Sequence, residues 1–324
     1  MKKRWLPLLL SGILIITMAT GCQSAVQKKK EGTFTILTSF YPMYIIALNL
    51  VDGAENVELR NLASPSTGCL HDYQMRPTDM VSLEQNDVMI INGAGMEEFL
   101  EDAQKGMEDL TIIDATEGIS LLPSIEHTHE HEEEEQEEAH DHDHGELNAH
   151  SWLSLELYEE EIQNIAKALS EYNPENAAVY ENNAEEYSKK IEQLKQLEDD
   201  VKQEMEGKKI VIFHEAFAYM ANDSGMEVIE SLEVETDAGL SAGQIRHLID
   251  EVEESNADLL ISEKQYSGKI GQTIEKETGI QDITLDSCVT GEMDKNSYLE
   301  AMENNLRILK EALSNESQLR LSLH

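Results

Sequence analysis

Three histidines and one aspartate occupy positions where they could together hold a metal ion. His71 lies in a loop after an apolar run, His150 opens a helical stretch, and His214 directly follows the strand-like run KIVIF. Asp286 follows the apolar run DITL near the end of the chain. Imidazole is a preferred ligand of zinc and of other late first-row ions, and a closed zinc site has four donors. Three imidazoles and the Asp286 carboxylate would supply that set.

The fourth donor of such a site is open to alternatives. Glu263 directly follows the run ADLLIS, and Glu235 lies earlier in the second half of the chain. Either carboxylate, or a water molecule, could take the place of Asp286. The remaining histidines outside the acidic insert, His247 and His324, have settings typical of surface residues.

Two cysteines flank the candidate ligands. Cys69 precedes His71 by two residues, and Cys288 follows Asp286 by two residues. If His71 and Asp286 meet at one ion, the two thiols should also lie near each other, and an oxidising compartment would allow a disulfide. The rival hypotheses are that one thiolate is itself a ligand, or that the two cysteines are unrelated buried residues.

Residues 126–146 form a low-complexity insert of histidines and carboxylates. The insert has no apolar residue beyond Ala139, so it cannot bury a core, and we expect it to be disordered. Its side chains could hold metal weakly and raise the local concentration near a tighter site, or they could simply form a solvated acidic loop. Its histidines are His127, His129, His131, His140, His142 and His144.

The charge balance and the N-terminus indicate the compartment. The chain carries 65 acidic and 24 basic residues, a formal charge of −41 that repels nucleic acid and concentrates cations. Basic residues followed by a short apolar stretch and small residues predict a signal peptide over residues 1–21. We expect Cys22 to be lipidated, with residues 22–32 as a tether; an ordinary signal peptide with an incidental cysteine is the alternative.

The ligand candidates must be positioned by an alternation of strands and helices. Strand-like runs alternate with amphipathic stretches in both halves, which predicts an α/β fold of two lobes, residues 33–172 and 208–324. Each lobe is expected to hold a roughly four-stranded parallel sheet. The runs are 33–39, 57–62, 87–92 and 110–114 in the first half and 209–213, 228–232, 257–262 and 282–285 in the second.

Residues 173–207 predict one long helix between the lobes. Asn173 is a good N-cap, Pro174 suits a first helical turn, and Gly207 is placed to end the helix. A helix of this length would span about 50 Å at 1.5 Å per residue, which suggests a rigid connector.

Four segments carry a resemblance to a known family. HDY with RPTD at 71–79, HSWLS at 150–154, FHEAFAY at 213–219 and LDS at 285–287 occur in the order found in the zinc/manganese solute-binding lipoproteins of ABC importers. The chain therefore resembles the ZnuA/TroA-like family, also called cluster A-I. The resemblance implies two α/β lobes bridged by one long helix, with a metal bound between the lobes.

The resemblance also implies a function and a metal. It implies a monomeric protein on the extracellular face of the cytoplasmic membrane that captures zinc and delivers it to a cognate ABC permease with a separate ATPase. Zinc-binding members resemble this chain in having a histidine at the third segment and a His-rich insert. Manganese-binding members have a carboxylate at the third segment and lack the insert. Manganese is the alternative cargo.

Two other functional classes are less compatible with these residues. A zinc hydrolase of the HExxH type would need a second histidine where Ala218 stands. A surface adhesin would account for a membrane anchor but not for four ordered ligand segments. We therefore expect a binding protein rather than an enzyme.

Overall fold

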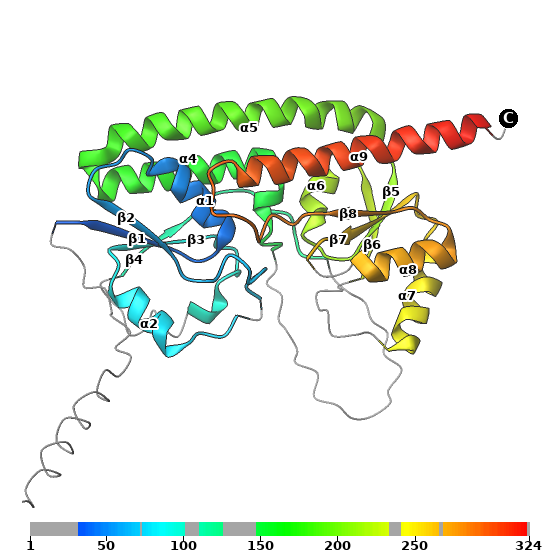
Figure 1. Ribbon diagram of the computed structural model, residues 1–324, viewed down its shortest axis with the longest axis horizontal. Coiled ribbons are helices and arrows are strands. Elements are labelled where there is room, and N and C mark those ends of the chain that lie inside the picture. The colour runs from blue at the N-terminus through cyan, green and yellow to red at the C-terminus, as the bar shows by residue number, and fades with distance from the viewer. Residues whose placement is uncertain are drawn as a thin grey trace, which may run out of the picture. The chain divides into compact units, whose positions relative to one another are not determined.

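The structure is a computed structural model, and it describes residues 32–71, 73–100, 110–125, 147–232, 241–265 and 268–322. These residues form two four-stranded parallel sheets with helices packed around them (Figure 1). The predicted α/β fold class is confirmed. No helix among the described residues is long and apolar enough to cross a membrane.

The first sheet has the strand order β2-β1-β3-β4. Its central strands β1 and β3 are buried, which is why they read in the sequence as nearly continuous apolar runs. The strands are β1 (Phe34–Thr38), β2 (Val57–Asn61), β3 (Val88–Ile91) and β4 (Thr111–Asp114). The described residues of this half also form the helices α1 (Tyr41–Leu50), α2 (Pro77–Glu84) and α4 (Leu155–Tyr172), with short 3-10 turns η1 (Glu98–Leu100) and η2 (Ser151–Leu153).

The second sheet repeats this order as β6-β5-β7-β8. Its strands are β5 (Lys209–Ile212), β6 (Glu227–Ser231), β7 (Leu259–Glu263) and β8 (Asp282–Leu285). The associated helices are α6 (Phe217–Asp223), α7 (Ala242–Ser255), α8 (Gly268–Thr278) and α9 (Ser297–Ser322). All described pairings in both sheets are parallel, so the carboxyl ends of the strands of each sheet lie at the same edge.

A long helix joins the two halves. The chain makes a 3-10 turn, η3 (Pro174–Asn176), before α5 (Ala177–Met205) begins, so the regular helix starts later than the predicted cap at Asn173. Helix α5 contacts α1 and α4 of the first half and α9 of the second half. It therefore packs against both lobes, as expected of a connector.

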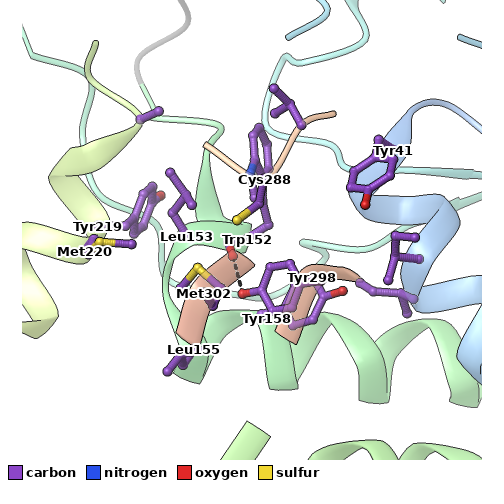
Figure 2. Close-up of a cluster of buried hydrophobic side chains, with 14 of the residues drawn as sticks. Tyr41, Trp152, Leu153, Leu155, Tyr158, Tyr219, Met220, Cys288, Tyr298 and Met302 are labelled. Atoms are coloured by element: carbon purple, nitrogen blue, oxygen red, sulfur yellow. Dashed lines mark hydrogen bonds between the residues drawn. The ribbon is translucent and has the colours of Figure 1, made fainter. Parts of the chain in front are cut away.

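A buried aromatic cluster ties the second half to the segment that follows His150 (Figure 2). The Tyr298 ring at the start of α9 stacks on Tyr158 of α4, with ring centroids 3.7 Å apart. The Tyr298 hydroxyl donates to the Trp152 carbonyl at 2.6 Å, the dashed line in Figure 2. The Trp152 indole N–H in turn donates to the Ser287 carbonyl at 2.9 Å. These bonds fix the chain next to His150 against the chain next to Asp286.

Two buried carboxylates, Glu97 and Glu161, accept hydrogen bonds in the first half of the fold. Glu97 accepts the backbone N–H groups of Asn92 and Gly93, and Glu161 accepts the Ser151 hydroxyl at 2.6 Å. Burial raises the pKa of Glu97 to about 7 and the pKa of Glu161 to about 8, and nearby carboxylates add to the Glu161 shift. Glu161 therefore stays protonated near neutral pH and anchors Ser151, the residue after His150.

The raised pKa of Glu161 makes the stability of the fold depend on pH. Between its ordinary value of 4.5 and about 8, the native state holds a proton that the unfolded state does not, so stability falls as pH rises through this window. Glu161→Gln keeps an acceptor for Ser151 but cannot ionise. We expect the free energy of unfolding in urea to fall less for this variant than for the wild type between about pH 5 and about pH 9.

The matched control is Glu160→Gln, which removes an exposed carboxylate from the same helix turn. It should keep the wild-type pH dependence of unfolding. If Glu161→Gln also keeps that dependence, Glu161 is not the buried acid inferred here.

Candidate metal centre

Each of the three predicted histidines lies at a junction between a loop and a regular element. His71 follows β2 in the loop that leads to α2, His150 immediately precedes η2, and His214 lies between β5 and α6. Ligands in parallel α/β folds collect in the loops beyond the carboxyl ends of the strands, so this placement agrees with a binding site.

The structure brings these histidines together and adds a cysteine. One potential ligand atom from each of Cys69, His71, His150 and His214 lies within 4.8 Å of the others. The Nε2 atoms of His71 and His150 are 3.2 Å apart, and the His150 and His214 ring centroids are 4.6 Å apart. Two nitrogens bound tetrahedrally at 2.0–2.1 Å from zinc would be about 3.3 Å apart. The donor types and spacing therefore fit a four-coordinate divalent ion.

Hydrogen bonds at the Nδ1 atoms orient two of the rings. His150 Nδ1 lies 2.9 Å from the Asn148 side-chain oxygen, whose assignment is fixed because the amide nitrogen donates to the Glu215 carbonyl. His214 Nδ1 lies 2.9 Å from the Glu263 carboxylate, and both groups are buried. Because each Nδ1 donates to an oxygen, Nε2 is the ring nitrogen that carries a lone pair.

The Glu263 carboxylate contacts His214 and is not one of the four grouped ligand atoms. Glu263 is a candidate for the fourth ligand because it ends a strand of the second sheet. The structure instead places its carboxylate on the outer nitrogen of His214, where it holds the ring and favours a proton on Nδ1, so that Nε2 faces the other ligand atoms.

Asp286 lies outside the group of four ligand atoms. Its carboxylate accepts hydrogen bonds from Lys264 at 2.9 Å, from the Gln265 amide at 2.7 Å and from the backbone N–H of Cys288 at 2.9 Å. Among the described residues, the Cys69 thiol stands in the group where the Asp286 carboxylate is expected. Asp286 as a metal ligand stays a prediction.

Cys69 and Cys288 are not joined by a disulfide in the structure. Cys288 is fully buried, its Sγ lies 3.6 Å from the Asp286 carbonyl, and burial raises the pKa of its thiol. Its backbone is in the left-handed region at φ 58, and its side chain lies in the buried cluster of Figure 2. The rival hypothesis, that one thiolate is itself a ligand, stays a prediction, and Cys69 is the cysteine that lies beside the histidines.

Several predicted features lie outside the described residues. They are the signal peptide and Cys22, the insert histidines His127, His129, His131, His140, His142 and His144, the alternative ligand Glu235, and His324. His247 is described, and it lies exposed on α7, 3.2 Å from Glu251 and apart from the group of four.

Comparison with known proteins agrees with a metal-binding role. The model of the ZnuA family, zinc-uptake complex component A, periplasmic, matches residues 36–312. The high-affinity zinc uptake system protein ZnuA of Bacillus subtilis is 29% identical over 97% of this chain and 99% of its own length. The zinc-binding lipoprotein AdcA of Streptococcus pneumoniae is 27% identical over 90% of this chain, which spans 58% of that longer protein.

Solved structures show the same fold. The crystal structure of the metal-dependent lipoprotein YcdH from Bacillus subtilis has a TM-score of 0.66 at 25% identity and covers 86% of this chain and 98% of its own. The chain belongs to the ZnuA family and is a metal-binding solute-binding protein of an ABC importer, not an enzyme.

Proposed function

We propose that this protein captures zinc outside the cytoplasm with His71, His150 and His214 and delivers the ion to its permease. The observation that carries the proposal is the convergence of three imidazoles from two lobes within coordination reach of one point. A nitrogen-rich set suits zinc better than manganese, which prefers oxygen donors. The names of the Bacillus and pneumococcal relatives, both zinc proteins, support the same cargo.

The residues around the imidazoles supply the conditions for binding. Asn148 and Glu263 hold two rings in the tautomer that offers Nε2, so less ordering is needed when the ion arrives. His150 and His214 are buried, whereas His71 is partly exposed, so an incoming ion can meet His71 first and exchange its water for the inner nitrogens.

Delivery requires partners that other chains provide. In this proposal a lipid on Cys22 and the tether 22–32 keep a monomeric protein at the outer face of the cytoplasmic membrane, beside an ABC permease and its ATPase. The pneumococcal relative is named a lipoprotein, which supports the anchor. Asp286 in this account is a neighbour of the site, held by Lys264 and Gln265.

Removal of the central ligand should disable capture. We expect His150→Ala to weaken zinc binding, measured by calorimetry, by more than the roughly 10–100-fold that loss of an outer-shell partner produces. The matched control is His247→Ala, which removes an exposed histidine and should leave affinity unchanged. Unchanged zinc affinity in His150→Ala would remove this histidine from the site.

The acidic insert is proposed to collect zinc weakly before it reaches the tight site. The residues that flank the insert already meet, because Pro123 and Leu147 form an antiparallel bridge and the Asn148 N–H donates to the Leu122 carbonyl at 2.8 Å. The insert can therefore be removed without pulling the site apart.

Deletion of residues 126–146 should leave one tight zinc site and abolish weaker binding at higher zinc concentration in the same calorimetric titration. Loss of the tight site would contradict the ligand assignment. Weak binding of unchanged stoichiometry would contradict the role of the insert while leaving the tight site intact.

A further inference from the structure

We propose that Cys69 is the fourth ligand and that its thiolate sets the class of metal the protein accepts, favouring the thiophilic ions zinc and cadmium over manganese. This inference rests on the proposed function, because it concerns the same site. It goes further in assigning selectivity to a residue of the ligand loop rather than to the histidines alone.

The local chain geometry places the Cys69 thiol beside His71. Leu70 separates the two residues, and its side chain is buried in the core with 1% of its surface exposed. The backbone bends at Leu70 and turns at His71, where the Tyr73 N–H donates to the Leu70 carbonyl at 2.9 Å, and the Cys69 and His71 side chains remain partly exposed. Gly68, with φ 88, makes the turn that leads into this segment. The Cys69 thiol lies within 4.8 Å of one ligand atom of each of the three histidines.

The nearby carboxylates are committed to other contacts. Asp286 accepts three hydrogen bonds from Lys264, Gln265 and Cys288, and Glu263 accepts from His214. Among the residues that the structure describes, the donor set at the site is therefore three nitrogens and one sulfur. Cys288 is not one of the four residues whose ligand atoms lie within 4.8 Å of one another.

The chemistry of this set separates metals by class. Thiolate sulfur is a soft ligand that suits zinc and its heavier congener, whereas manganese favours carboxylate, carbonyl and water oxygen. Binding breaks the Cys69 S–H bond and forms a sulfur–metal bond with no change in oxidation state, and the proton passes to water or buffer. The loop before Cys69, residues 65–68, lines a cavity of about 540 Å³ with Lys264 and Gln265.

The direct test uses cobalt(II) as a spectroscopic probe in the full-length protein. We expect the wild-type cobalt complex to show a thiolate-to-cobalt charge-transfer band in the near ultraviolet. That band should disappear in Cys69→Ser and persist in Cys288→Ala, the matched control. A cobalt complex without the band, or a band that survives in Cys69→Ser, would overturn the proposal while leaving the zinc-capture function in place.

Selectivity is tested by competition titrations with zinc, cadmium and manganese. Cys69→Asp replaces sulfur with oxygen and should narrow the zinc-over-manganese preference by about tenfold or more, with a larger loss for cadmium than for zinc. An unchanged preference in a variant that still binds zinc would contradict the role of Cys69 in selectivity. Failure of the wild type to bind zinc at all would instead contradict the proposed function.

Discussion

The site depends on a single constraint: three imidazole lone pairs from separate loops must point at one volume before an ion arrives. A histidine ring can rotate and can carry its proton on either nitrogen, so proximity alone does not make a ligand. Two of the rings are fixed by acceptors at Nδ1, Asn148 for His150 and Glu263 for His214. The third, His71, reaches the group from a loop whose neighbour Leu70 is buried. Orientation by outer contacts is therefore as much part of the site as the ligands.

The contacts between the two halves of the fold serve this constraint. His150 is followed by Ser151 and Trp152, which are held by Glu161 and Ser287, respectively. Tyr298 at the start of α9 donates to the Trp152 carbonyl, so the C-terminal helix also restrains this segment. These hydrogen bonds join specific donors and acceptors, and they restrain the segment that follows His150. The ligand loops thus rest on a shared core rather than on two independent lobes.

The sequence predicted most of the sheet and the histidines for clear physical reasons. Parallel strands buried on both faces appear as apolar runs, and histidines that directly follow such runs, as His214 does, belong to the edge where ligands collect. Helix α9 was not predicted, although Asn296 before its first residue Ser297 and Glu300 in its first turn are helix-start signals. The 3-10 turn before α5 was also missed, since a proline and an asparagine suit either kind of turn.

The choice of the fourth donor shows where sequence reasoning stops. Asp286 and Cys69 both lie next to predicted ligands, and spacing along the chain does not say which one faces the ion. In the structure Lys264 and Gln265 bind the Asp286 carboxylate, whereas the Cys69 thiol lies within 4.8 Å of the imidazole ligand atoms, and these contacts support the proposal of Cys69 as the fourth donor. The position of Cys69 two residues before His71 was the available signal, and it was equally compatible with a disulfide.

X-ray absorption at the zinc edge of the loaded protein tests the central claim most directly. The account predicts scattering from three imidazoles with nitrogen at about 2.0–2.1 Å and one sulfur at about 2.3 Å. A shell with fewer than three imidazoles would contradict the convergence of His71, His150 and His214 on one ion.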